Sequence, residues 1–385
     1  MSRSTERFLT THTGSLARPD DLFQAMWAKE QGIPVDRAAL AARVRSAVAE
    51  IVKKQVKAGV DIVSDGELSK PSYSTYVKER LSGFGGTTLT KPPPLKDVME
   101  FPGLEKRRQA AGGPQRHNRP ACDGPVALAD RTGLDADIAN MDAALKAAKL
   151  PKERGFLTAA SPGVVTEFFG NLHYPSHEAY VAAVADAMRP EYEAIANAGF
   201  TLQLDCPDLA MGKHIAFGDL DLSEFRKIAR IHVEALNHAT RNIPPERMRM
   251  HLCWGNYEGP HHHDVELKDI IDIVLLARPA GLSFEAANPR HAHEWALFET
   301  VKLPEGKVLI PGVLESKSNF IEHPELVAQR IGRYAKLVGR ENVIAGSDCG
   351  FSTFVDTARI DPEVVWRKLG AMAEGAKIAS KQFWR

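Results

Sequence analysis

Four residues in the second half of the chain carry side chains that suit a single zinc ion. His251 and Cys253 stand two residues apart in MRMHLCWG. Glu285 follows in GLSFEAANPRH, and Cys349 lies in VIAGSDCGF. One imidazole, one carboxylate and two thiolates form a complete tetrahedral donor set for zinc, and the sulfurs disfavour Mg²⁺ or Ca²⁺. If the fold brings the four together, the sequence predicts a zinc enzyme that handles a thiol.

These residues lie in a regular alternation of short apolar runs with amphipathic helical stretches. The apolar runs predict strands at 8–15, 59–67, 155–162, 200–207, 249–255, 281–287, 307–315 and 342–350. Helical patterns span 36–58, 135–149, 176–198, 222–241, 265–278, 290–300, 323–338 and 361–380. Ser223 and Pro324 are helix start signals. Eight β/α units in series predict an α/β fold, a (β/α)₈ TIM barrel. A doubly wound open sheet is the alternative, but the glycine-rich phosphate loop typical of it is absent from the sequence.

One segment, 82–134, breaks this rhythm. It is rich in Gly, Pro and basic residues and predicts a long insertion after the second strand. Loops of this length are usually functional or disordered. Two interpretations stay open: a lid that carries cations for an anionic substrate tail, or a solvated insertion or oligomer contact. We expect residues 1–385 to form a single barrel domain that carries this insertion.

Polar residues end the predicted strands with regularity. Catalytic groups of such barrels gather at the C-terminal ends of the strands. Because residues two apart in a strand face the same side, His251 and Cys253 can both point inward. Cys122 and Cys206 are interpreted as ordinary small buried residues. The run HHH at 261–263 lies in a loop, where substrate contact is a better interpretation than zinc binding. The polar residues at strand ends are His12, Ser15, Asp65, Glu67, Asp205, Cys206, His251, Cys253, Glu285, Ser316, Lys317, Asp348 and Cys349.

Composition narrows the class of protein. The 49 basic and 49 acidic residues balance, which argues against a nucleic-acid partner. The N-terminus has no apolar stretch of signal-peptide length, and no run of 18 apolar residues occurs, so we expect a cytoplasmic protein without a membrane partner. The four cysteines are few and widely spaced, which favours metal binding or catalysis over disulfides. The sequence does not decide between a monomer and a homo-oligomer.

The motifs THTGSL, DIVSDGE, LQLDCP, HLC and GSDCGF, together with Glu285, resemble the catalytic barrel of the cobalamin-independent methionine synthases over nearly the full chain. The resemblance implies that the four metal-binding candidates hold a catalytic Zn²⁺. It implies that Gly14 and Ser15 contact the homocysteine carboxylate. It also implies that Glu67 and Asp205 contact the homocysteine amine.

Three departures from that family affect what the resemblance implies. The chain has no room for the second, N-terminal barrel that helps to hold the folate. Cys206 stands where the family has a glutamate, and Lys317 stands approximately where it has a histidine. The chain therefore looks like the short single-barrel relatives, which include epoxyalkane:coenzyme M transferases and short microbial methionine synthases.

The leading hypothesis is a zinc-dependent transfer of a methyl group to homocysteine, from a methyl-folate or a simpler donor. Zinc would activate the small-molecule thiol as a thiolate, which then attacks the alkyl donor. The alternative is the opening of an epoxide by a sulfonated thiol. A purely structural zinc in a binding protein is disfavoured, because the ligands come from three separate strands at an open barrel mouth.

Two further sets of residues have open roles. Trp254 and Asn256 either line the donor pocket or pack the loop. The proton for the leaving group could come from any of several acids, among which the sequence does not choose. These candidates are Asp348, His12, Lys317 and Glu67.

Overall fold

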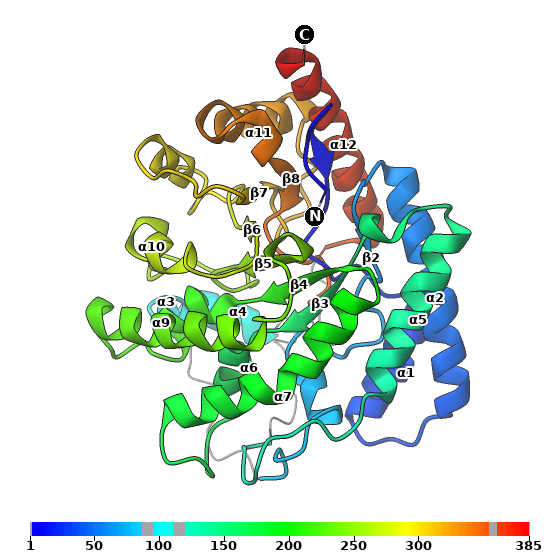
Figure 1. Ribbon diagram of the computed structural model, residues 1–385, viewed down its shortest axis with the longest axis vertical. Helices are drawn as coiled ribbons and strands as arrows, with labels where there is room; N and C mark the ends of the chain where they lie inside the picture. The colour runs from blue at the N-terminus through cyan, green and yellow to red at the C-terminus, as the bar shows by residue number, and fades with distance from the viewer. Residues whose placement is uncertain (1, 87–94, 111–119, 354–359, 385) are drawn as a thin grey trace.

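The computed structural model describes residues 2–86, 95–110, 120–353 and 360–384, and its centre is a sheet of eight parallel strands (Figure 1). The sheet order is β1-β8-β7-β6-β5-β4-β3-β2, so each strand lies beside its neighbours in the chain and β8 returns to β1. The strands are β1 (Leu9–Thr10), β2 (Val63–Ser64), β3 (Gly155–Ala160), β4 (Thr201–Asp205), β5 (Met248–Leu252), β6 (Gly281–Phe284), β7 (Val308–Leu314) and β8 (Ile344–Ser347).

Backbone hydrogen bonds join the two ends of this sheet. The carbonyl oxygen of Thr10 accepts from the N–H of Asp61 at 3.1 Å and of Ile62 at 3.0 Å. These bonds link β1 to the residues that enter β2, so the sheet closes on itself. The (β/α)₈ barrel is confirmed, and all eight predicted strands are present, although each is shorter than its apolar run.

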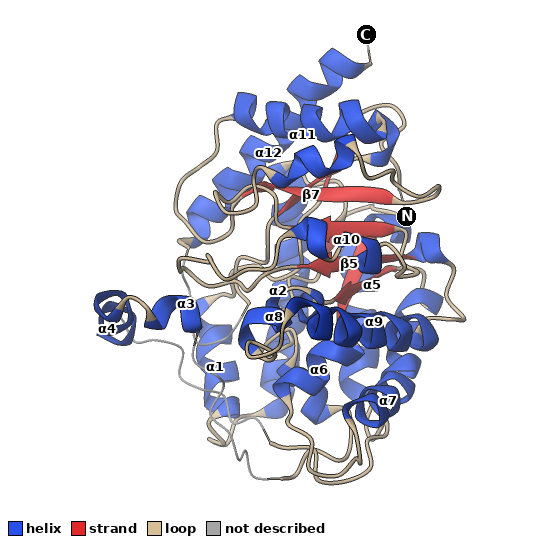
Figure 2. Cartoon of the chain, turned by 90° about the vertical axis from the view of Figure 1, so that its left-hand side faces the viewer, coloured by secondary structure: helices blue, strands red, loops and turns tan. Residues whose placement is uncertain are grey.

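Helices surround the barrel on its outer side (Figures 1 and 2). Their buried faces share one large hydrophobic cluster with the outward side chains of the strands. No helix in the described part of the chain has the length and hydropathy of a membrane span. The main helices are α1 (Asp20–Glu30), α2 (Arg37–Ala58), α5 (Thr132–Ala147), α6 (Pro162–Phe168), α7 (His177–Asn197), α8 (Met211–Ile215), α9 (Leu222–Ala239), α10 (Ile271–Val274), α11 (Pro324–Val338) and α12 (Pro362–Phe383).

Several expectations about the helices need correction. Ser223 does not start α9: Asp221 is the N-cap and forms a capping box with Glu224. The helix predicted over 265–278 is reduced to a 3₁₀ turn and the four residues of α10. The helix predicted over 290–300 is a 3₁₀ helix, Glu294–Glu299, because polar tertiary contacts hold its first turn. Pro324 begins α11 as predicted.

A separate apolar cluster fills the inside of the barrel and forms a floor beneath the strand ends. Above it lies the buried Arg249, whose guanidinium carbon stacks 3.5 Å from the ring centroid of Phe156. Arg249 donates to Gln203 Oε1 at 2.7 Å, to Thr11 Oγ1 at 2.8 Å and to the carbonyl of His12 at 2.7 Å. This polar layer fixes β1, β4 and β5 relative to one another just below their C-terminal ends. The apolar cluster consists of Leu9, Ile62, Phe156, Val308, Ile310 and Ile344.

The segment between β2 and α5 is the long insertion that the sequence predicts. Its described part contains α3 (Lys96–Met99) and α4 (Pro102–Ala110), which stand out from the body of the barrel (Figure 2). Asp97 attaches α3 to the loop after β5, because its Oδ2 accepts from Tyr257 Oη at 2.8 Å and from the N–H of His261 at 2.9 Å. The basic part of this segment, residues 106–119, is described only as far as residue 110. The lid function and the single-domain division stay predictions.

Candidate metal centre and active site

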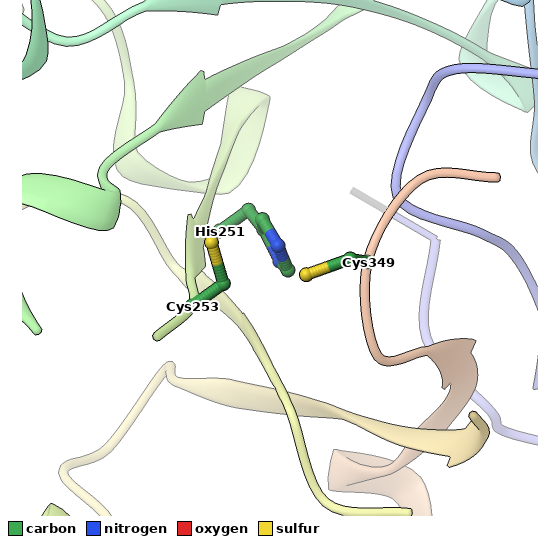
Figure 3. Close-up of side chains that lie close together, drawn as sticks. All are labelled: His251, Cys253 and Cys349. Carbon is green, nitrogen blue, oxygen red and sulfur yellow. The ribbon is translucent and has the colours of Figure 1, made fainter. Parts of the chain in front are cut away.

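Three of the four predicted zinc ligands meet at the C-terminal end of the barrel. The ligand atoms of His251, Cys253 and Cys349 all lie within 4.8 Å of one another, and all three side chains are buried. His251 is on β5, Cys253 follows that strand directly, and Cys349 follows β8. Figure 3 shows the three side chains close together, with the imidazole of His251 drawn between the two sulfur atoms. The cysteines are free thiols, as the sequence predicts.

Glu285, the fourth predicted ligand, lies at the edge of this cluster. Its Oε1 is 3.5 Å from Cys349 Sγ and accepts from the backbone N–H of Trp254 at 2.9 Å. It is not among the three residues whose ligand atoms are mutually close. The carboxylate is therefore adjacent to the thiols but turned partly toward its own hydrogen-bond donors. Its role as a zinc ligand stays a prediction.

The other oxygen of Glu285 is held by two donors. Lys317 Nζ lies 2.7 Å from Oε2, and Asn288 Nδ2 donates to the same atom at 2.7 Å. Burial raises the pKa of the Glu285 carboxyl, but the positive charges of Lys317 and His291 and the hydrogen bond from Lys317 together hold it below its usual value. Hydrogen bonds of this kind orient a carboxylate ligand and leave one oxygen for a metal. Lys317, predicted as catalytic, thus lies where it positions Glu285.

The residues present fit a metal ion with sulfur and nitrogen ligands. His251 Nδ1 lies 3.2 Å from Ser283 Oγ, while its Nε2 is buried with no hydrogen-bond partner among the described residues. A buried imidazole nitrogen without a partner costs free energy that a metal bond would offset. The hydrogen bond from the Cys349 thiol lowers the pKa of Cys253 to about 6, so one thiolate is already favoured there.

Two buried carboxyl groups lie beside this centre. Asp205 ends β4 and pairs in register with His251 of β5, and Glu67 follows β2. Burial raises the pKa of Glu67 to about 8, with the carboxylate of Asp205 adding to the effect, and burial raises that of Asp205 to about 6. Glu67 Oε2 is buried without a hydrogen-bond partner among the described atoms. The two carboxyl groups are close enough to repel each other when charged, and one oxygen of Glu67 has no hydrogen bond to balance this.

Gly14 approaches Glu67 so closely that no side chain fits there. A Cβ atom at Gly14 would lie 2.4 Å from Glu67 Oε1 and 2.8 Å from Thr158 Cγ2, and the backbone has φ +147°. Ser15 is buried at the other side of this turn, and its carbonyl accepts from the N–H of Phe351 at 2.9 Å. The turn after β1 is therefore packed between Glu67 and the segment after β8.

His12 and Asp348 are engaged in ways that favour support over proton transfer. His12 Nδ1 accepts from the N–H of Gly14 at 3.2 Å, so its Nε2–H donates to Gln55 Oε1 at 2.8 Å. Burial lowers the pKa of His12 to about 4, which keeps the ring neutral. Asp348 accepts backbone N–H groups of residues 286, 287 and 288, each at 2.8 Å. It fixes the turn that follows Glu285. The catalytic assignments of both residues stay predictions.

Trp254 and Asn256 occupy different surroundings. The Trp254 indole is fully buried, stacks on His291 at 3.9 Å and donates its Nε1–H to the carbonyl of Val265 at 2.6 Å. This placement matches loop packing, one of the two interpretations. Asn256 is partly exposed, and its Nδ2 donates to the carbonyl of Gly350 at 2.8 Å and to Thr353 Oγ1 at 2.6 Å. It joins the β5 loop to the segment after β8.

Ser283 and Asn288 belong to the site but were not singled out in the sequence. Ser283 is the cross-strand neighbour of His251, and it stands two residues before Glu285 on β6. Because residues two apart in a strand face the same side, Ser283 could have been predicted to face inward with Glu285. Its pairing with His251 depends on the register between β5 and β6, which the sequence does not give. Asn288 stands three residues after Glu285. Its side chain reaches the Glu285 carboxylate only because the chain forms a turn there, which the sequence does not predict.

The chain is similar in sequence and in fold to known proteins. No protein-family model matches the chain. It is 22% identical to a methionine synthase of Saccharolobus solfataricus over 388 residues, which covers 98% of this chain and 96% of that protein. A methionine synthase of Thermococcus kodakarensis is 22% identical over 346 residues, covering 89% of this chain and 84% of that protein.

Among solved structures, the B12-independent methionine synthase from Shewanella sp. W3-18-1, in complex with selenomethionine, has a TM-score of 0.73. The two chains are 20% identical, and the match covers 98% of each. This likeness shows the shared barrel fold. The chain is thus similar in sequence to methionine synthases over most of its length, and it shares its barrel fold with a B12-independent methionine synthase.

Proposed function

We propose that the protein is a zinc-dependent S-methyltransferase that transfers a methyl group to homocysteine from a methyl-folate or a simpler donor. One observation carries the proposal. The imidazole of His251 and the thiols of Cys253 and Cys349 converge within 4.8 Å at the barrel mouth, with the Glu285 carboxylate beside them. The ligands come from separate strands and not from a local Cys pair, which is typical of catalytic zinc sites.

The donor set explains why a thiol is the expected nucleophile. When bound by His251, Cys253, Cys349 and Glu285, zinc supplies the positive charge that lets a substrate thiol lose its proton near neutral pH. Two thiolates and a carboxylate leave a formal charge of about −1 on such a centre, by simple counting. Lys317 supplies a compensating cation at the outer oxygen of Glu285. The site thereby stays electron-rich without burying an uncompensated charge.

The two carboxyl groups of Glu67 and Asp205 suit the amino group of an amino-acid thiol. Glu67 and Asp205 both have raised pKa values, and Glu67 Oε2 has no protein partner among the described residues. A substrate ammonium would donate to that oxygen and stabilise both carboxylates in their charged form. Asp205 pairs in register with His251, so the amine would be held next to the thiol centre.

The leaving atom of the donor needs a proton, and two of the four candidate acids suit that role better. The ring nitrogens of His12 and the oxygens of Asp348 are already engaged by protein donors and acceptors. Glu67 carries a proton at neutral pH only until the substrate ammonium binds beside it, whereas Lys317 carries one throughout. Lys317 is therefore the better of these two candidates.

A screen of thiols against donors tests the proposal. Purified protein is incubated with homocysteine or a sulfonated thiol, each with a methylated folate, a simple methyl donor or an epoxide, and the products are identified by mass spectrometry. We expect methionine from homocysteine, and none with Cys349→Ser. A thioether formed from the sulfonated thiol and the epoxide, with no methionine from any donor, would overturn the proposal in favour of epoxide opening.

A further inference from the structure

A second group of metal-ligand side chains lies outside the proposed active site. Glu100, His262 and His263 offer one carboxylate and two imidazoles whose ligand atoms all lie within 4.8 Å of one another. His262 Nε2 is 2.7 Å from Glu100 Oε2, and His263 Nε2 is 2.5 Å from Glu100 Oε1. Both imidazoles therefore meet the two oxygens of one carboxylate from neighbouring positions in a turn.

The group joins two segments that are far apart in sequence. Glu100 directly follows α3 in the insertion, whereas the histidines belong to the loop after β5. Buried contacts fix both segments: Asp97 of α3 accepts from the N–H of His261, and the His261 ring bonds to Asp264 and to the carbonyl of Tyr257. His261 has φ +56°, a left-handed conformation that opens the turn carrying the next two residues. Hydrogen bonds of neighbouring residues thus hold Glu100, His262 and His263 close together, in addition to the contacts among these three side chains.

The chemistry of this donor set fits a borderline divalent cation. Two imidazoles and one carboxylate are the protein ligands of many three-ligand zinc sites, in which a water molecule takes the fourth position. Ligand atoms around tetrahedral zinc lie about 3.3 Å apart, given metal–ligand bonds of about 2.0–2.1 Å. The ligand atoms here lie within 4.8 Å of one another. The side chains of Glu100, His262 and His263 are 50%, 36% and 41% exposed, so small side-chain rotations can bring these atoms to the spacing that zinc requires.

We propose that Glu100, His262 and His263 form a second divalent-metal site, which binds Zn²⁺ or a similar ion and ties the insertion to the rim of the barrel. Its ligands differ from those of the first centre because they include no sulfur. Binding would replace the direct imidazole–carboxylate hydrogen bonds with metal–ligand bonds, with each ring proton held on Nδ1. The two sites can therefore be told apart by spectroscopy.

Metal counting on tag-free protein tests the proposal. The protein is stripped with a chelator, reloaded with Co²⁺ or Zn²⁺ alone, desalted, and its metal content is measured by mass spectrometry. We expect two equivalents in the wild type and one in both Glu100→Gln and His263→Ala. Cys349→Ser should also bind one, and it alone should lose or strongly weaken the sulfur-to-Co²⁺ charge-transfer absorption. His293→Ala, which changes an exposed histidine elsewhere, is the matched control and should bind two.

Two results would overturn this second site. One is a wild type that binds a single equivalent, lost in Cys349→Ser. The other is a Glu100→Gln protein with the wild-type metal content. Because Glu100 is exposed, that substitution does not threaten folding, and circular dichroism verifies this. If the thiol centre itself were misassigned, the sulfur charge-transfer band would be absent in every variant, while the loss on Glu100→Gln would persist.

Discussion

Replacing Lys317 with Met removes the cation that faces a buried carboxylate and keeps most of the side-chain volume. Lys317 Nζ lies 2.7 Å from Glu285 Oε2, with the two side chains 10% and 0% exposed. Removing one partner of a buried ion pair usually costs about 3–5 kcal/mol. Asn288 and the Trp254 N–H still bind Glu285, so we expect the lower end, about 3 kcal/mol.

The assay is urea unfolding of the metal-free protein, followed by zinc titration against a chromophoric chelator. Because Lys317 orients a ligand, zinc affinity should also fall by about 10- to 100-fold. Lys302→Met, at an exposed position, is the matched control and should change neither quantity. If Lys317→Met matched Lys302→Met in both stability and zinc affinity, Lys317 would have no role in holding Glu285. A fall in kcat with unchanged zinc affinity would instead make Lys317 the proton donor.

Three further predictions concern the surroundings of the centre. The pKa of Glu67 is raised from 4.5 to about 8, so folded protein holds a proton that unfolded protein releases between these values. Stability of the metal-free protein should therefore fall as pH rises across that window, by up to about 1.4 kcal/mol per pH unit, and Glu67→Gln should flatten the dependence in urea titrations. Asp348→Asn should lose about 2–4 kcal/mol, because an amide cannot accept all three backbone N–H groups; unchanged unfolding would contradict this. Gly14→Ala should raise the KM for homocysteine by at least about tenfold, because its Cβ would lie 2.4 Å from Glu67 Oε1; an unaltered KM would place the substrate elsewhere.

The barrel was predictable because its signal is local. Each strand is a short apolar run, and the polar residue that ends it marks the edge where the site lies. The prediction of an α-helix over 290–300 was wrong. Amphipathic periodicity cannot show that the Glu294 carboxylate binds the N–H of Leu267 and the ring of His291. The first of these contacts comes from the segment after β5 and the second from the segment after β6, and together they override helix propensity.

The candidate site was predictable in type but not in its contacts. His251 and Cys253 share a face through strand alternation, which the sequence displays directly. That Cys349 meets them depends on closure of the barrel, and the partners of Glu285 depend on one turn held by Asp348. The contact between Glu100 and His262 depends on how the insertion folds back onto the loop after β5. The composition of the insertion does not predict this.

The most direct test of the central claim is zinc-edge X-ray absorption of the reloaded protein, before and after addition of homocysteine. Glu100→Gln protein is used, so that the second site does not contribute to the spectrum. We expect two sulfur ligands at about 2.3 Å in the free enzyme and a third after homocysteine is added. Zinc that is retained when Cys349→Ser is added to the Glu100→Gln protein, or a sulfur count that homocysteine does not change, would contradict this expectation.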